Sequence, residues 1–235
     1  MGEIIAMGGG GFSMEPDNSL LDLYVLNQAS ATRAKICFLP TASGDSEAYI
    51  AKFYKAFEQY SCEPSHLSLF RLPTRDLENY VLEKDVIYVG GGNTKSMLAL
   101  WTEWGLDVIL RKAWEKGVLL TGLSAGSICW FEQGLTDSYG DVLQPLKCLG
   151  FLKGSNCPHY DSEAARRPTF HKYILAADML AGYAADDGVA LHFSGTELKQ
   201  AVSSRPHSRA YYVNTKDGTP VEQEVHTIYL GNRCF

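Results

Sequence analysis

The sequence predicts a single α/β domain over residues 1–235, with a mostly parallel β-sheet and helices on both of its faces. Short apolar runs alternate with helical stretches through the first half of the chain, which is typical of repeated βαβ units. The 235 residues are enough for one sizeable core, and no linker, low-complexity tract or internal repeat divides them. With 20% charged and 46% hydrophobic residues, the composition is that of a folded protein.

Five short apolar runs are predicted as strands, and helical stretches separate them. The strands are expected at 4–7, 35–39, 66–70, 85–89 and 117–121. The helices are expected at 17–28, 47–60, 95–104 and 106–116, and aromatic residues recur in the second of them at nearly helical spacing. Right-handed crossovers then place helices on both faces of the sheet.

The second half of the chain is less regular. Residues 187–193 and 200–204 are predicted as strands. The segments 210–213 and 225–230 are predicted as a C-terminal β-hairpin, with residues 214–219 as the connection. This hairpin is expected to form an edge of the sheet or part of a dimer.

Composition limits the partners and the location of the protein. The net charge is −6 and no basic run is present, which argues against nucleic acid as a partner. No apolar run reaches the roughly 18 residues of a membrane span, and the first one is too short for a signal peptide. The six cysteines include no CxxC pair and no zinc-site spacing, so we expect a cytoplasmic protein without a metal.

The segment Gly122-Leu123-Ser124-Ala125-Gly126 carries the main functional signal. It follows an apolar strand and precedes residues 127–131, which can begin a helix. Gly-x-Ser-x-Gly between a strand and a helix is the pattern of a nucleophile elbow, where a sharp turn exposes the serine hydroxyl. The alternative is a glycine-rich turn with an incidental serine.

Two further glycine loops follow predicted strands, at the sheet edge where ligands collect in open parallel sheets. Residues 8–11 lack the full dinucleotide fingerprint and are expected to form a tight turn. The loop Gly90-Gly91-Gly92-Asn93-Thr94 has backbone N–H groups that could cradle an anion. Asn93 or Thr94 could equally serve as a helix N-cap.

A serine nucleophile needs a base, and His159 is the best candidate among the six histidines. It lies in a polar, turn-forming segment, residues 155–161, of the kind that often carries catalytic residues. The alternative is an ordinary surface histidine.

Three motifs together resemble the peptidase E family, in both order and approximate spacing. They are residues 90–94, 122–127 and 158–160, and the similarity extends from the first strand to about His192. The family contains aspartyl dipeptidases and is related to cyanophycinases and to class I glutamine amidotransferase-like folds.

The resemblance implies a serine peptidase for small peptides that needs no cofactor. Ser124 would be the nucleophile and His159 the base. The oxyanion of the tetrahedral intermediate would be bound by backbone N–H groups of Ala125 and of Gly91 or Gly92.

In that family an acidic residue orients the histidine. Asp187 matches the acidic-Gly position, where relatives often carry Glu, and Asp186 could replace it if the register slips. Asp137 is the second choice and Asp161 the third.

Substrate-binding residues are expected on both sides of the site. An aspartyl dipeptidase needs a cation for the substrate carboxylate, and Arg166 and Arg167 could supply a bidentate contact. Asn93 is the candidate on the glycine loop. His171 and Lys172 extend the positive cluster and could instead bind a free terminal carboxylate.

Other functions and partners stay open from the sequence. A cyanophycinase-like enzyme or another hydrolase of this fold would use the same machinery, and a catalytically silent binding protein would keep only the fold. Glutamine amidotransfer normally uses a cysteine at the elbow, which Ser124 argues against. A homodimer interface or ordinary helix-to-sheet packing would each explain three tryptophans, Trp101, Trp104 and Trp114.

Overall fold

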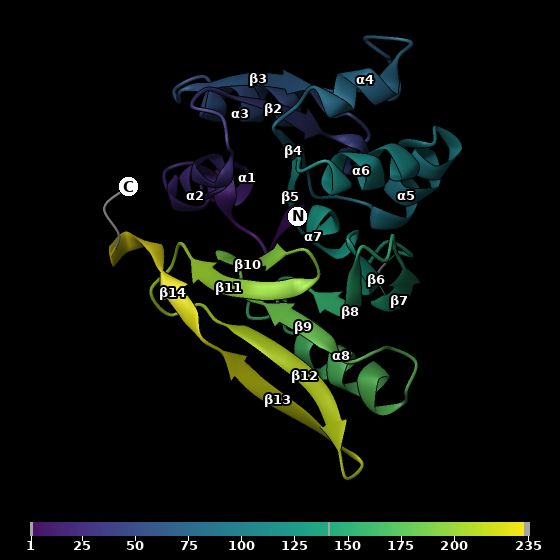
Figure 1. Ribbon diagram of the computed structural model, residues 1–235. Helices are drawn as coiled ribbons and strands as arrows, with labels where there is room; N and C mark the ends of the chain where they lie inside the picture. Colours follow the sequence, from purple (N-terminus) through teal and green to yellow (C-terminus); the bar gives the residue numbers. More distant parts are fainter. Residues whose placement is uncertain (1, 141, 233–235) are drawn as a thin grey trace.

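Two mixed β-sheets form the framework of the computed structural model, which describes residues 2–140 and 142–232 (Figure 1). The larger sheet runs in the order β14 (Thr227–Tyr229), β11 (Glu197–Ser203), β10 (Val189–Ser194), β1 (Glu3–Met7), β5 (Leu119–Leu123), β4 (Val86–Val89), β2 (Ala34–Leu39) and β3 (Cys62–His66). The smaller sheet runs in the order β13 (Thr219–Val225), β12 (Ala210–Lys216), β9 (Gly182–Ala185), β8 (Leu152–Cys157), β6 (Phe131–Thr136) and β7 (Gln144–Lys147).

The parallel part of the larger sheet contains the five strands from β3 to β1. On the far side of β1, β10 and β11 continue the sheet as antiparallel neighbours. The predicted α/β class is therefore confirmed, whereas the single predicted sheet is divided in two. The strands of the smaller sheet, except for the hairpin, were not predicted from the sequence.

Helices cover both faces of the larger sheet, as predicted. Successive side chains of a strand point to opposite faces, so Ile4 and Ala6 belong to one core and Ile5 and Met7 to the other. The first core includes residues of α4 (Leu77–Leu82), α5 (Thr94–Glu103) and α6 (Leu106–Glu115). The second includes residues of α1 (Gly11–Met14), α2 (Leu20–Gln28) and α3 (Glu47–Phe57).

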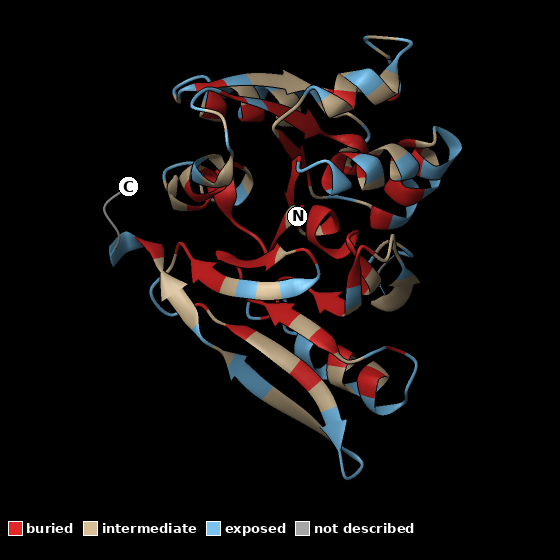
Figure 2. Cartoon of the chain, in the orientation of Figure 1, coloured by how far each residue is buried: buried red, intermediate tan, exposed pale blue. Residues whose placement is uncertain are grey.

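The smaller sheet packs against α8 (Arg166–Leu175) and has its own apolar cluster, which includes Phe170, Ile174 and Val213. Its outer strand β13 has only intermediate and exposed residues, in contrast to central strands of the larger sheet such as β4 and β5, which are buried throughout (Figure 2). The remaining short elements are α7 (Ala125–Ile128) and the 3₁₀ turns η1 (Thr41–Ser43) and η2 (Leu230–Asn232).

Two predicted elements are misplaced. The strand expected at 66–70 is β3, which ends at His66, because an edge strand with one neighbour tolerates its polar residues and Pro64. The hairpin has a two-residue turn, Asp217-Gly218, with φ of 52° and 72° as a type I′ turn requires. Residues 227–229 pair with β11 in the larger sheet and are not part of the hairpin.

The tryptophans that suggested a dimer are mostly internal. Trp101 and Trp114 belong to the core between the helices and the larger sheet, and only Trp104 is exposed, at 41%. Packing therefore accounts for two of them, and the homodimer stays a prediction. Among the helices of residues 2–140 and 142–232, none has the length and apolar character needed to span a membrane.

Candidate active site

Ser124 occupies a strained turn between β5 and α7. Its φ of 54° and ψ of −111° lie in a region that non-glycine residues rarely adopt, and the side chain stays half-buried. This is the backbone geometry of a nucleophile elbow. The helix that follows is a single turn of 4 residues, shorter than the helix expected from 127, because Phe131 already begins β6.

Both glycines of the elbow are required by close packing against β4. A Cβ atom on Gly122 would lie 2.5 Å from the carbonyl oxygen of Val89, and one on Gly126 would lie 2.3 Å from the same oxygen. Real Cβ atoms do not approach backbone oxygens so closely. The Gly-x-Ser-x-Gly spacing thus lets the turn sit directly on the neighbouring strand.

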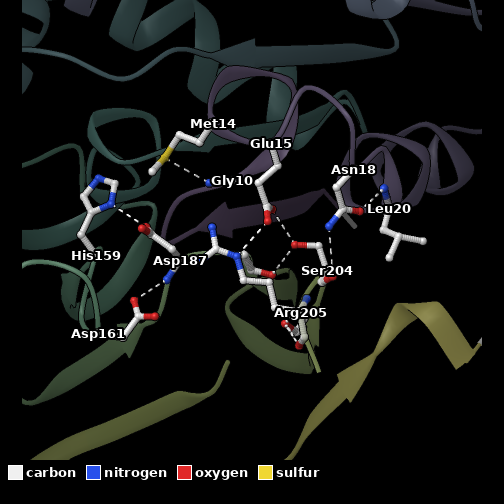
Figure 3. Close-up of polar contacts among 12 residues, drawn as sticks. Gly10, Met14, Glu15, Asn18, Leu20, His159, Asp161, Asp187, Ser204 and Arg205 are labelled. Atoms are coloured by element: carbon white, nitrogen blue, oxygen red, sulfur yellow. Dashed lines mark hydrogen bonds and ion pairs between the residues drawn. The ribbon is translucent and has the colours of Figure 1, made fainter. Parts of the chain in front are cut away.

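His159 and Asp187 form a buried pair. The imidazole Nδ1 lies 2.7 Å from Asp187 Oδ1, and the two residues are 8% and 4% exposed (Figure 3). His159 follows β8 with a φ of 53°, and Asp187 lies in the turn between β9 and β10. Because Nδ1 faces the carboxylate, Nε2 is the ring nitrogen left for other partners.

Backbone hydrogen bonds join the carboxyl end of β1 to the segments that carry Ser124, His159 and Asp187. This strand lies between β5, which leads to Ser124, and β10, which follows Asp187. Three consecutive carbonyls accept the bonds: Met7 from the Ser124 N–H (3.2 Å), Gly8 from the His159 N–H (3.3 Å) and Gly9 from the Gly188 N–H (3.1 Å). The ends of loops distant in sequence are thereby fixed along one short stretch of backbone.

Gly9 lies directly against the His159–Asp187 pair. A Cβ atom at this position would be 2.0 Å from Asp187 Oδ1 and 3.1 Å from His159 Cε1. The glycine run at 8–11, predicted only as a tight turn, therefore also forms a wall of the site. Its position at the end of the first strand was the signal that could have indicated this role.

The Asp187 carboxyl is held ionised by its neighbours. Burial by itself would raise its pKa, but hydrogen bonds from His159 and Ser162 and the charges of His159 and Arg205 outweigh burial. The result is a pKa below the ordinary value for aspartate. An ionised carboxylate at Nδ1 can stabilise a protonated imidazole.

The other candidate acids occupy different places. Asp161 Oδ1 accepts the backbone N–H of Asp187 at 2.8 Å, so it supports Asp187 instead of touching the imidazole. Asp186 Oδ2 accepts the Arg209 N–H, and burial followed by nearby acids raises its pKa to about 6. Asp137 is exposed after β6, and no contact joins it to His159 in the described part of the chain.

The backbone N–H groups predicted as oxyanion donors differ in whether they already have a hydrogen-bond partner in the described residues. Ala125 is the first residue of α7, where an N–H has no partner within the helix. The Gly91 N–H donates to the Tyr49 hydroxyl at 3.2 Å, although a Cβ at Gly91 would lie only 3.4 Å from Ser124 Cβ. Gly92 has a φ of 137° and would clash with the Ala42 carbonyl if it carried a Cβ.

The three residues predicted to bind substrate all have internal partners. Asn93 caps α5 by accepting the Ser96 N–H at 2.8 Å, and its amide donates to the Ser138 carbonyl. Arg166 is buried, and its guanidinium binds Glu163 and the Leu135 carbonyl. These contacts favour structural roles for both residues, and substrate binding by them stays a prediction.

Arg167 is partly exposed and also engaged. Its guanidinium lies 3.3 Å from Glu222 and stands over the rings of Tyr160 and Tyr211 at 4.6 and 4.9 Å. His171 shares the same Glu222 carboxylate. The predicted positive cluster is thus partly neutralised within the protein.

No group of three or more His, Cys, Asp or Glu side chains is placed to hold a metal ion within residues 2–140 and 142–232.

Comparisons with known proteins show which proteins the chain resembles in sequence and in fold. The sequence is 58% identical over 231 residues to the Bacillus subtilis (strain 168) protein "Uncharacterized peptidase YgaJ", covering 98% of this chain and 100% of that one. Two crystal structures have the same fold at low identity. One is a peptidase from an acI-B1 Actinobacterium (TM-score 0.65, 18% identity, 97% of this chain and 95% of that one). The other is assigned as a peptidase E protein from Listeria monocytogenes EGD-e (TM-score 0.57, 17% identity, 96% and 100%).

Residues 4–201, most of the chain, match Peptidase family S51. The family resemblance inferred from the three motifs is confirmed, and with it the expectation of a peptidase fold. The chain therefore belongs to Peptidase family S51.

Proposed function

We propose that the protein is a serine peptidase that hydrolyses short peptides, in particular dipeptides with an N-terminal aspartate. The observation that carries the proposal is the arrangement along the end of β1, which holds the strained Ser124 on one side and the His159–Asp187 pair on the other. Membership of a peptidase family supports the reaction class.

The chemistry is acyl transfer through an acyl-enzyme. Ser124 Oγ attacks the peptide carbonyl carbon while His159 Nε2 takes the hydroxyl proton, and the carbonyl becomes a tetrahedral oxyanion. The C–N bond then breaks as His159 returns the proton to the leaving amine. Water repeats the sequence on the ester, which releases the acid and restores Ser124. Asp187 keeps the proton on Nδ1 and stabilises the imidazolium.

The N–H groups of Ala125 and Gly92 are the proposed oxyanion donors. Gly91 is less suited because its N–H is engaged by Tyr49. One preorganised donor of this kind is typically worth about 3 kcal/mol of barrier. Gly91 instead allows the loop to approach Ser124 closely.

The preference for N-terminal aspartate is the finer part of the proposal and rests on the family resemblance. Arg166 and Arg167 are already paired with Glu163 and Glu222. A substrate carboxylate would therefore have to compete with Glu222 for Arg167, the more exposed of the two. A cyanophycinase-like hydrolase would use the same serine on β-linked aspartyl peptides, which makes linkage the discriminating feature.

A substrate panel tests the proposal. Dipeptides that begin with Asp, Ala or Leu, their N-blocked forms and β-aspartyl-arginine are incubated with the wild type, Ser124→Ala and Ser96→Ala. Ser96 is an exposed serine on α5 and serves as the matched control. We expect cleavage of free Asp-dipeptides by the wild type and by Ser96→Ala, and none by Ser124→Ala.

Each alternative gives a different pattern. Equal cleavage of Asp, Ala and Leu dipeptides would remove the specificity and keep the peptidase. Preferred cleavage of β-aspartyl-arginine would indicate the cyanophycinase-like reaction. No hydrolysis of any peptide, together with no labelling of Ser124 by a fluorophosphonate, would overturn the proposal in favour of a silent binding protein.

A further inference from the structure

An ion pair between Glu15 and Arg205 lies behind the acid of the proposed triad. Arg205 Nε donates to Glu15 Oε1 at 2.8 Å, and Figure 3 shows the guanidinium between the carboxylates of Glu15 and Asp187. Glu15 immediately follows α1, and Arg205 follows β11. Neither residue was singled out by the sequence.

The pair is held in place by the backbone around Asp187. Gly188 is next to Asp187, and a Cβ atom there would lie 2.9 Å from Arg205 Cγ, so the arginine stem packs on this glycine. The Ser204 hydroxyl donates to Glu15 Oε2 at 2.7 Å, and the Ser204 N–H donates to the Gly188 carbonyl at 2.8 Å. The guanidinium is therefore fixed relative to the Asp187 turn.

Several charged groups surround Asp187 from the elements packed against it. They are His159 and Asp161 after β8, Asp186 on the same turn, Arg205 after β11 and, through Arg205, Glu15 after α1. Within this set, Arg205 is the cation that acts on Asp187 in addition to the protonated imidazole of His159. The positive charge of Arg205 acts on the Asp187 carboxylate, and the negative charge of Glu15 partly cancels this effect of Arg205.

We propose that Glu15 and Arg205 are positioning residues that set the electrostatic field at the His159–Asp187 pair, with opposite effects on the basicity of His159. The expected effect on the kcat/KM profile rests on the proposed function, whereas the effect on the His159 titration does not. A positive charge near Asp187 weakens the attraction of the carboxylate for an imidazolium, and a negative charge beside it restores that attraction.

The direction of the change in each variant follows from the charge that the substitution removes. Arg205→Gln removes the cation, so the imidazolium form of His159 is stabilised and the acid limb of the kcat/KM profile should move to higher pH. Glu15→Gln leaves Arg205 unbalanced, so the same limb should move to lower pH. For one charge at this kind of separation in a partly exposed setting, each shift is about half a pH unit.

The test measures the His159 titration directly. The imidazole resonances are followed by NMR against pH in the wild type, Arg205→Gln, Glu15→Gln and Arg205→Lys, and the His159 signal is assigned by its loss in His159→Gln. Arg33→Gln is the matched control, because it removes an exposed cation that pairs with Glu63 far along the sheet. Thermal unfolding checks that every variant folds.

Shifts of opposite sign for Arg205→Gln and Glu15→Gln, with Arg205→Lys and Arg33→Gln near the wild type, are the expected result. Shifts of the same sign, or less than about 0.2 pH unit in both folded variants, would overturn the inference. Because this readout needs no turnover, it decides the inference even if no peptide in the panel is cleaved, which would count against the proposed function alone.

Discussion

Nδ1 of His159 lies 2.7 Å from Oδ1 of Asp187, and both residues are almost completely enclosed. In the neutral imidazole this contact favours the tautomer with its proton on Nδ1, which in the proposed mechanism leaves Nε2 to act as the base. This relationship favours Asp187 over the other candidate acids and gives the first prediction.

Asp187→Asn should lower kcat by about 10³- to 10⁴-fold, because the amide cannot stabilise the imidazolium and can hold the wrong tautomer. Asp137→Asn is the matched control, since Asp137 is exposed and was the second candidate from the sequence. Its kcat should stay within about twofold of the wild type. Steady-state kinetics on a cleaved dipeptide make the comparison, and an equal loss in Asp137→Asn would refute the assignment of Asp187.

Asp161 should act through a hydrogen bond more than through its charge. Asp161→Asn keeps an oxygen that can accept the Asp187 N–H, whereas Asp161→Ala removes it. We expect Asp161→Ala to lose about fivefold in kcat with little change in KM, because losing one hydrogen bond that positions Asp187 costs about 1 kcal/mol. Asp161→Asn should recover most of that loss. If Asn is as damaging as Ala, the charge of Asp161 matters and the hydrogen-bond explanation is wrong.

Much of the larger sheet could be predicted from the sequence. Strands such as β2 and β4 are buried on both faces, so they appear as continuous apolar runs, and the helices between them show helical spacing. The smaller sheet could not be recognised in this way. Strands β7 and β13 lie at its edges and are half-exposed, so their polar residues resemble loops.

The candidate site was predictable to a similar extent. Ser124 and His159 lie in local motifs that signal a turn and a polar loop. The Glu15–Arg205 pair depends on contacts between residues 190 positions apart, and no local pattern reveals such a contact. Arg166 shows the reverse case, because its charge suggested substrate binding while the fold buries it against the Leu135 carbonyl.

Gly9→Ala should strongly lower activity while leaving most of the protein folded. The added methyl would overlap Asp187 Oδ1, so the His159–Asp187 pair has to move. We expect a loss of at least about 100-fold in kcat, since small misplacements of reacting groups are costly. Gly44→Ala is the control, because it has open space but a φ of 66°, and it should cost about 1 kcal/mol of stability without loss of activity. Normal activity in Gly9→Ala would show that the wall at Gly9 is not needed.

The stability of the protein should depend on pH through Asp22, a residue of α2 that lies next to Gly11 of α1. Asp22 is 2% exposed, and burial raises its pKa from 3.8 to about 7 against the hydrogen bonds from Phe12 and Tyr88. The folded state therefore favours the neutral carboxylic acid. Its contribution is fully present below pH 3.8 and is lost as the pH rises through about 7.

Asp22→Asn should remove this dependence, because the amide stays neutral at every pH. Relative to the wild type, the variant should gain free energy of unfolding as the pH rises from 4 to 8, on the order of 4 kcal/mol at the upper limit. Urea unfolding at several pH values measures the gain, with the exposed Asp17→Asn as the matched control. A constant difference between variant and wild type across this range would show that Asp22 is ionised in the folded protein.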